Sequence, residues 1–286
     1  MIKKKKSKPH PPLFNDQLSH DTKLIHASKK VIRKTKREVN KKRRPDQFAN
    51  LKNQEGFIVE IQSLSKNFVS GGNIITRVLN DLNLQIKQGE FIVLYGKSGS
   101  GKSTLLNIMS GLDRPTKGQV IVANKNLPYL SNRQLTMFRR EHLSFIFQQY
   151  HLLNNITGYE NVETGAYLKK DKKKKTEDGE DEIRLLFEQF DLIDVIDKFP
   201  SQMSGGQQQR ISIMRALSKN ADIIFADEPT GALDHKTSLI VMECLKEINE
   251  KLNKTIIMVS HDPSVAKYAS RVITLDHGKI INDKNQ

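Results

Sequence analysis

The sequence predicts an α/β fold built on a mostly parallel core sheet. From Gly56 onward, short apolar runs bounded by turn residues alternate with helical segments. Apolar strands separated by helices are typical of a parallel sheet that helices cover on both faces. The longest apolar runs, FIVLY and DIIFA, have the length of strands. None approaches the roughly 20 apolar residues that a membrane-spanning helix needs.

The predicted elements follow one another along the chain. Strands are expected at 57–61, 82–86, 89–95, 119–123, 143–147, 222–226, 255–259 and 271–275. Helices are expected from Lys102 to a stop at Gly111, and at 131–142, 204–219 and 236–251. Between about 159 and 200 the strands disappear, and two helices flank a charged insert, 169–182, that has lysines in its first half and acids mostly in its second. We expect this insert to be an exposed, flexible loop.

The distribution of charge divides the chain into two parts. Residues 1–55 contain 17 Lys and Arg against 5 Asp and Glu, so they carry +12 of the total net charge of +15. This extension is rich in Lys, Pro, Asn and Ser, and we expect it to be largely disordered. The alternative is a cationic helix that lies on an anionic membrane surface or binds nucleic acid. Its thin apolar stripe consists of Leu24, Ile25, Val31, Ile32 and Val39.

The rest of the chain, residues 56–286, is expected to form the folded domain and is close to neutral, with a net charge of +3. Its single cysteine, Cys244, permits no internal disulfide, which favours a cytosolic chain. Cys244 lies in an amphipathic helical segment, so we interpret it as a small core residue.

The segment GKSGSGKST, Gly96 to Thr104, lies between a predicted strand and a predicted helix. Its spacing matches the P-loop in the strand–loop–helix context that this pattern requires. Glycines let backbone N–H groups converge on a β-phosphate, and the helix N-terminus adds further donors. We expect the Lys102 ammonium to lie between the β- and γ-phosphates of ATP and the Ser103 hydroxyl to ligate Mg²⁺.

Polar side chains also follow three other predicted strands. Asp227 and Glu228 come after DIIFA, at the sheet edge where ligands bind in open α/β folds. Two adjacent carboxylates there are costly unless they serve a metal or a proton. We therefore expect Asp227 to hold the Mg²⁺ shell and Glu228 to polarise the attacking water. His261 is expected to contact the γ-phosphate, and Gln148 to supply a neutral oxygen to Mg²⁺ or water.

A second set of glycines occurs in MSGGQQQR, residues 203–210. Ser204, Gly205 and Gly206 open a helix, so they present N–H groups to an anion. The phosphate in the P-loop is already enclosed on its own side. If two chains pack head to tail, these glycines face the γ-phosphate that the other chain holds. Two ATP molecules then lie between two copies in a closed twofold dimer.

Residues from about 57 to 282 resemble the ATP-binding subunit of ABC transporters. The motifs occur in that family's order: P-loop, glutamine loop, signature (MSGGQ), Walker B carboxylates, D-loop (Ala232 to Asp234) and switch histidine. ADEPTGALD, SGGQQQR and FIFQQYHLLNNITGYENV are most similar to the branch that includes lipoprotein-release, macrolide-export, bacitracin-resistance and cell-division ATPases. The resemblance implies a P-loop NTPase fold with an antiparallel β subdomain and an α-helical subdomain at about 150–215.

The resemblance also implies a complete set of site residues. Phe68 stands where the family stacks an aromatic ring on adenine. The nucleotide-binding residues are then Phe68, Gly96, Lys97, Ser98, Gly99, Ser100, Gly101, Lys102, Ser103, Thr104, Gln148, Ser204, Gly205 and Gly206. The catalytic residues are Lys102, Glu228 and His261, and the Mg²⁺ ligands are Ser103, Gln148 and Asp227. Met203 replaces the usual leucine of the signature and Lys97 a frequent proline, and we expect both changes to be harmless.

A function follows from the resemblance: an ATP hydrolase at the cytoplasmic face of the membrane that powers a transporter. Extrusion of lipid, lipoprotein or peptide is favoured over nutrient import. The expected partners are a separately encoded integral membrane permease and a second ATP-binding subunit, with a homodimer favoured. The alternative is a soluble ABC ATPase that acts on nucleic acid or ribosomes, for which the basic tail is the argument. The intact Lys102, Asp227, Glu228 and His261 disfavour a regulatory subunit that does not hydrolyse ATP.

Overall fold

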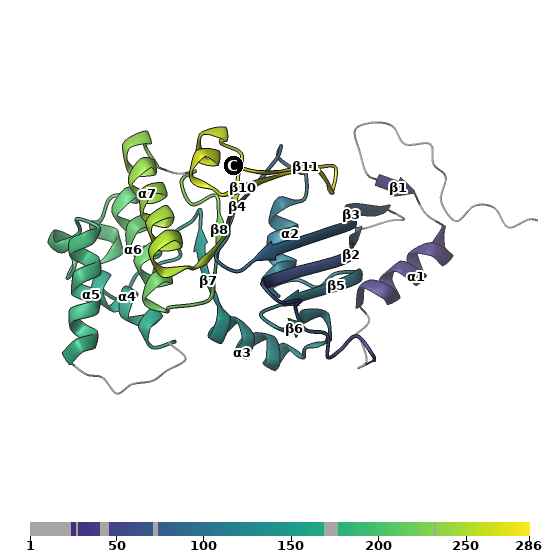
Figure 1. The fold of residues 1–286 in the computed structure, drawn as a ribbon, viewed down its shortest axis with the longest axis horizontal. Helices are drawn as coiled ribbons and strands as arrows, with labels where there is room; N and C mark the ends of the chain where they lie inside the picture. Colours follow the sequence, from purple (N-terminus) through teal and green to yellow (C-terminus); the bar gives the residue numbers. More distant parts are fainter. Residues whose placement is uncertain (1–23, 27, 41–45, 71–73, 169–176, 232) are drawn as a thin grey trace, which may run out of the picture.

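The structure is a computed structural model that describes residues 24–26, 28–40, 46–70, 74–168, 177–231 and 233–286. Two β-sheets and a group of helices build it, as Figure 1 shows. The helices α4 (Gly158–Ala166) and α5 (Glu177–Gln189) lie at one end of the long axis, and the antiparallel sheet lies toward the other. No helix in the described ranges combines the length and apolar character needed to cross a bilayer.

The larger sheet has the strand order β11-β10-β4-β9-β8-β7. Five neighbouring strands are parallel, and the last strand along the chain adds to this sheet as an antiparallel edge. These strands are β4 (Phe91–Tyr95), β7 (Leu143–Phe147), β8 (Ile223–Asp227), β9 (Thr255–Ser260), β10 (Arg271–Asp276) and the antiparallel β11 (Lys279–Asn285). The predicted mostly parallel core sheet is therefore confirmed.

Side chains alternate between two cores on either side of this sheet. In β4, Ile92 and Leu94 join one hydrophobic core, whereas Phe91 and Val93 join the other. The same alternation runs through β8 and β9, because successive side chains of a strand point to opposite faces. The first core is shared with α2 (Lys102–Met109), α3 (Asn132–His142) and the antiparallel sheet. The second is shared with α5, α6 (Gly205–Ser218) and α7 (His235–Leu252).

The antiparallel sheet has the order β1-β3-β2-β5-β6, in which β1 is the short strand Leu24–His26. Its central hairpin consists of β2 (Phe57–Ser70) and β3 (Ile74–Lys87), and β5 (Lys117–Val122) and β6 (Lys125–Asn126) complete one side. The short helical turns η1 (Leu127–Tyr129), η2 (Ile193–Val195), η3 (Pro200–Gln202) and η4 (Pro263–Tyr268) connect the larger elements. The antiparallel subdomain implied by the family resemblance is present.

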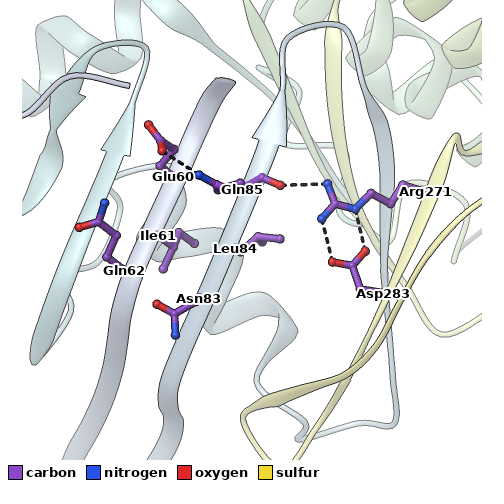
Figure 2. Close-up of a pocket in the computed structure, with 8 residues that line it drawn as sticks. All are labelled: Glu60, Ile61, Gln62, Asn83, Leu84, Gln85, Arg271 and Asp283. Atoms are coloured by element: carbon purple, nitrogen blue, oxygen red, sulfur yellow. Dashed lines mark hydrogen bonds and ion pairs between the residues drawn. The ribbon is translucent and has the colours of Figure 1, made fainter. Parts of the chain in front are cut away.

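A polar clamp joins the two sheets beside a cavity of about 370 Å³. In Figure 2, the Arg271 guanidinium from β10 donates to both carboxylate oxygens of Asp283, at 2.7 Å each. It also donates to the Gln85 carbonyl of β3 at 2.9 Å. Hydrogen bonding to Asp283 raises the pKa of Arg271 above its ordinary value. This side chain therefore ties the C-terminal hairpin of the parallel sheet to the antiparallel sheet.

The N-terminal extension departs from the expected disorder over part of its length. Residues 29–40 form the helix α1 (Lys29–Asn40), and the short strand β1 (Leu24–His26) pairs with β3. On α1, Ile32 and Thr35 are each only 6% exposed, and the helix packs against β2. The alternative of a helix with one apolar stripe is wrong for Leu24 and Ile25, because these two residues lie in the strand β1 and not in the helix. Residues 1–23, 27 and 41–45 lie outside the described residues.

The charged insert also differs from the expected loop. Helix α5 begins at Glu177, so the part of the insert from 177 to 182 is helical. Residues 169–176 lie outside the described residues.

The helices α4 and α6 pack closely against each other, since a Cβ on Gly165 would lie 2.1 Å from the Arg215 carbonyl oxygen. Only a residue without a side chain permits this approach.

The clamp between the sheets leads to a prediction about stability. Replacing Arg271 by Met keeps the aliphatic stem but leaves Asp283 and the Gln85 carbonyl without their donor. We expect the free energy of unfolding to fall by about 2 kcal/mol, because a partly buried pair is broken. Urea unfolding followed by circular dichroism measures the change. Lys279→Met, on the same hairpin but exposed, is the control, and equal stability of the two variants would contradict the assignment.

Candidate nucleotide site

The P-loop runs from the end of β4 to the start of α2. Gly96, Gly99 and Gly101 have φ values of 153°, 77° and 106°. A Cβ on Gly96 would lie 2.3 Å from the Leu275 carbonyl oxygen, and a Cβ on Gly101 would lie 2.9 Å from the Leu79 side chain. Glycine is therefore required at both positions, by conformation as well as by space. The loop that results leads directly into the N-terminus of α2, where backbone N–H groups lack helical partners.

The Lys102 side chain folds inward over this loop. Its ammonium donates to the carbonyls of Gly96, at 2.6 Å, and Lys97, at 2.9 Å. Burial lowers the pKa of Lys102, while the nearby carboxylates of Glu228 and Asp227 act in the opposite direction. The adjacent Ser100 hydroxyl is buried without a hydrogen-bond partner in the described part of the chain. The loop thus encloses one cation and one unpaired polar group, which suits a cradle for an anion.

Asp227 and Ser103 meet across the edge of the sheet. The Ser103 hydroxyl donates to the Asp227 carboxylate at 3.5 Å. Burial raises the pKa of Asp227, and Glu228 raises it further, whereas the Ser103 hydrogen bond and Lys102 lower it. The described residues hold no cluster of three His, Cys, Asp or Glu side chains suited to a metal. Hard oxygen donors in so small a number fit Mg²⁺, which usually binds one or two protein carboxylates together with phosphate oxygens.

Glu228 lies in an unusual backbone conformation at the end of β8. Its φ is 48°, in the left-handed region that costs a non-glycine residue free energy. The Glu228 N–H donates to the Val259 carbonyl at 3.0 Å, and the Glu228 carbonyl accepts from the Gly231 N–H at 3.1 Å. Its carboxylate is 3.0 Å from Nδ1 of His261. These contacts hold the carboxylate at the mouth of the site.

Gln148 approaches the same point from β7. A Cβ on Gly231 would lie 3.2 Å from the Gln148 amide nitrogen and 3.4 Å from a Glu228 carboxylate oxygen. The side chains of Gln148 and Glu228 therefore converge on Gly231. Glu228 and His261, but not Gln148, line a cleft of about 530 Å³ between α7 and η4. The structure thus brings together the predicted residues of four neighbouring strands.

The signature glycines lie at a separate helix tip. Ser204 caps α6: its hydroxyl accepts from the Gln207 N–H at 3.3 Å, and the Gln207 side chain accepts from the Ser204 N–H at 2.8 Å. A Cβ on Gly205 would lie 2.7 Å from the Tyr150 hydroxyl, and one on Gly206 would lie 3.3 Å from Thr237. Among the described residues, no hydrogen bond joins this tip to the P-loop of the same chain. The two segments that are predicted to bind phosphate therefore lie on separate elements of this chain.

Phe68 remains accessible on β2. Its side chain is 41% exposed, and the Lys66 ammonium lies 4.7 Å from its ring centroid. Lys66 is itself held by Asp113 at 2.7 Å. In the sheet, Phe68 pairs with Thr76 of β3, which in turn pairs with Leu24 of β1. An exposed aromatic face next to a fixed cation is compatible with base stacking, which remains a prediction.

Sequence reasoning missed the capping role of Asp234 and did not single out Gln209. Asp234 caps α7, since its carboxylate accepts from both the N–H and the hydroxyl of Thr237, at 3.1 and 2.6 Å. The D-loop resemblance named Asp234, but the capping pattern of Asp followed three residues later by Thr could have assigned this role. Gln209 is 1% exposed and donates to the carbonyl of Pro229 at 2.6 Å. No local signal distinguishes it from the glutamines beside it.

The unfavourable ionisation of Asp227 can be tested without nucleotide. Because its pKa is higher in the folded chain, the ionised carboxylate costs stability once the pH exceeds its ordinary range. We therefore expect Asp227→Asn to raise the free energy of unfolding at about pH 7 by up to about 1 kcal/mol. The gain should vanish at about pH 3, where both states bind the proton. Urea unfolding at the two pH values measures it.

Asp262 provides the matched control. Hydrogen bonds from the Ser264 N–H and hydroxyl lower the pKa of Asp262. Its ionised form therefore stabilises the fold above the ordinary pKa of an aspartate, and this contribution is lost as the pH falls through the lowered value. Asp262→Asn should accordingly reduce stability at about pH 7. A loss of stability for Asp227→Asn under the same conditions would contradict the interpretation.

Comparison with known proteins agrees with this geometry. A family model described as ABC transporter matches residues 79–231. The macrolide export ATP-binding/permease protein MacB of Bartonella henselae is 44% identical over 234 residues, which cover 80% of this chain and 34% of MacB. The uncharacterized ABC transporter ATP-binding protein MJ1508 of Methanocaldococcus jannaschii is 45% identical over 216 residues, which cover 75% of this chain and 94% of MJ1508. The chain thus spans only about a third of the length of the MacB relatives.

Solved structures give the same result. The ATP-binding cassette MJ0796, in a dimeric post-hydrolysis state bound to ADP and Pi, superposes with a TM-score of 0.73 and 39% identity, over 79% of this chain and 98% of that one. CbiO1 from Clostridium perfringens, part of the transporter complex cbiONQ, superposes with a TM-score of 0.70 and 28% identity, over 81% and 89% of the two chains. These matches confirm the predicted fold and ATP-hydrolase class: the chain belongs to the ATP-binding cassette family of ABC transporters.

Proposed function

We propose that the chain binds ATP with Mg²⁺, pairs with a second cassette around two ATP molecules, and uses their hydrolysis to drive a membrane transporter. One observation carries this proposal. Lys102, Asp227 and Glu228 converge at one edge of the parallel sheet with Gln148 and His261, whereas the signature tip lies on a different helix. The proposed site for binding and cleaving a triphosphate therefore lacks only the groups that would cover the γ-phosphate from its exposed side.

The chain's own residues divide the work at this site. The P-loop amides and Lys102 hold the phosphates and balance their charge. Ser103, Asp227 and Gln148 are the residues that would hold Mg²⁺, which neutralises charge on the β- and γ-phosphate oxygens when bound. Phe68 offers its exposed ring to the adenine. Glu228, oriented by its contact with His261, accepts a hydrogen bond from the attacking water and so directs it in line with the γ-phosphate.

The signature tip completes the site in trans. Its backbone N–H groups and helix dipole favour an anion, and the γ-phosphate bound to a second copy is the anion that a twofold dimer brings to it. ATP then favours the closed pair because it contacts both copies only in that state. Hydrolysis removes the shared contact and lets the pair open. The dimeric state of the similar cassette MJ0796 supports this arrangement.

The proposed partner is an integral membrane permease, and the favoured pair is a homodimer at the cytoplasmic face of the membrane. The names of the MacB relatives, which join an ATP-binding part and a permease in one protein, support an export-type system. Lipid, lipoprotein or peptide extrusion is favoured over nutrient import. Co-purification with a polytopic membrane protein from detergent-solubilised membranes, rather than with a nucleic-acid fraction, distinguishes this function from a soluble ATPase acting on nucleic acid or ribosomes.

The extension gives the cassette an additional cationic surface. One face of α1 packs on β2, so the face that remains outward presents Lys30, Arg33, Lys34 and Arg37, all of which are exposed. Figure 1 shows α1 beside the antiparallel sheet, away from α4 and α5. Because its buried apolar face is already occupied, α1 can meet an anionic membrane only through charge. We include contact with anionic lipid headgroups in the proposed function.

The catalytic assignment predicts a trapped dimer. Glu228→Gln keeps the size of the side chain but removes the carboxylate that accepts from water, so turnover should fall by at least about 100-fold while ATP still binds. The variant should then elute as a dimer with excess ATP and Mg²⁺, measured by light scattering. Glu243→Gln, an exposed substitution on α7, is the control. Monomer alone in the trapped variant would refute the sandwich.

The surface on α1 predicts salt-sensitive membrane binding. Wild-type chain should sediment with vesicles containing phosphatidylserine, and replacing Lys30, Arg33, Lys34 and Arg37 by Gln should weaken the binding at least about 10-fold, since each cation near an anionic surface contributes about 1 kcal/mol. Vesicles of phosphatidylcholine alone should bind neither protein. Binding to duplex RNA is measured separately at the same salt concentration. Tighter binding to RNA than to the vesicles would favour the alternative function, a soluble ATPase that acts on nucleic acid or ribosomes.

A further inference from the structure

Three consecutive glutamines follow the signature glycines, and each makes a different contact. Gln207 closes the capping box of α6 through the Ser204 N–H. Gln208 donates to the carbonyls of Pro200, at 3.0 Å, and Met203, at 3.2 Å, in the turn before the helix. Gln209 alone of the three is fully buried. Its side-chain amide contacts the ends of two strands of the parallel sheet.

The Gln209 amide nitrogen bonds to the backbone at the ends of β7 and β8, next to two of the polar site residues. It donates to the Pro229 carbonyl at 2.6 Å and lies 3.4 Å from the Phe147 carbonyl. Pro229 directly follows Glu228, and Phe147 directly precedes Gln148. β7 and β8 pair at this point, with Phe147 opposite Asp227. One side chain in the second turn of the signature helix therefore holds the backbone next to the proposed water-directing carboxylate and next to the proposed glutamine ligand.

The Gln209 bond adds to the contacts that surround the left-handed backbone of Glu228. The strained backbone at Glu228, with φ 48°, requires surrounding contacts that over-determine it. The bond from Gln209 to the next carbonyl is buried, so losing it would leave that carbonyl without its donor. The Gln209 amide oxygen has no hydrogen-bond partner among the described residues. The side chain is thus held by its donor bonds, which suits a role in positioning rather than in filling space.

We infer that Gln209 is a positioning residue that couples the seat of the signature helix to the loops bearing Glu228 and Gln148, so that turnover at the chain's own site depends on how its signature tip is engaged. This inference rests on the proposed role of Glu228. Gln209 contacts no part of the P-loop by hydrogen bond in the described chain. Its loss should therefore affect the orientation of the carboxylate and leave nucleotide affinity largely unchanged.

Steady-state hydrolysis by the full chain tests this coupling. Gln209→Met, which keeps the length but removes the donor, should lower kcat by at least about 10-fold while KM for ATP stays within about 3-fold. Gln208→Met is the matched control and should keep kcat within about 2-fold. The assays are run at a temperature at which circular dichroism shows all variants folded. A normal kcat in Gln209→Met, or an equal loss in Gln208→Met, would overturn the inference.

A second variant uses pH as an independent readout. Gln209→Glu directs a carboxylate oxygen at two carbonyl oxygens, and burial raises the pKa of such a carboxyl. Once protonated, it can donate to the Pro229 carbonyl again. The ratio of variant to wild-type kcat should therefore rise at least about 3-fold as the pH falls from about 8 to about 6. A constant ratio would count against a donor role.

The trapped-dimer variant separates the inference from the function on which it rests. If Glu228→Gln hydrolyses ATP like the wild type, the assignment of Glu228 fails, and the coupling fails with it. If Glu228→Gln is inactive while Gln209→Met is normal, only the coupling fails. In the double variant Glu228→Gln with Gln209→Met, the ATP-bound dimer should still form, because Gln209 acts on turnover and not on binding.

Discussion

The register of four adjacent parallel strands is the constraint on which the site depends. Tyr95 pairs with Ser260, Val259 with Asp227, and Asp227 with Phe147. The P-loop, His261, Glu228 and Gln148 therefore all begin within a residue of one line across the sheet. Because side chains alternate along a strand, a slip of one residue would turn each polar group toward the wrong face. The two cores fix the register, since each strand divides its apolar side chains between them.

Several site residues are unfavourable for folding, and the packing of the two hydrophobic cores must offset their cost in free energy. Burial disfavours the charged forms of both Lys102 and Asp227, and Glu228 occupies a strained backbone conformation. Each feature is unfavourable for folding alone, and strain of this kind clusters at functional sites. The carboxylates partly offset the cost at Lys102, as Lys102 does for Asp227. A bound phosphate would offset the cost at Lys102 further, which is consistent with the proposed binding of an anionic ligand.

The sequence predicted the parts of this structure that depend on local patterns. The parallel strands, the P-loop, and the polar residues at the strand ends could be read from periodicity and spacing, because each signal lies within a dozen residues. The docking of Ile32 and Thr35 on β2 could not, since it depends on a sheet surface distant in sequence. The same holds for the Arg271 clamp, whose partners come from β3 and β11. Composition alone suggested disorder for a segment that the fold partly orders.

The run of glutamines shows why identical residues can have unrelated roles. On a helix, successive side chains point about 100° apart, so Gln207, Gln208 and Gln209 face the helix cap, the preceding turn and the sheet, respectively. Only the third direction crosses from the helical subdomain to the strand ends. One helix, α6, therefore carries both the tip that is proposed to bind a phosphate and the side chain that bonds the backbone next to the proposed catalytic residues. Any shift at the tip must displace either the Gln209 bond or the loops that it holds.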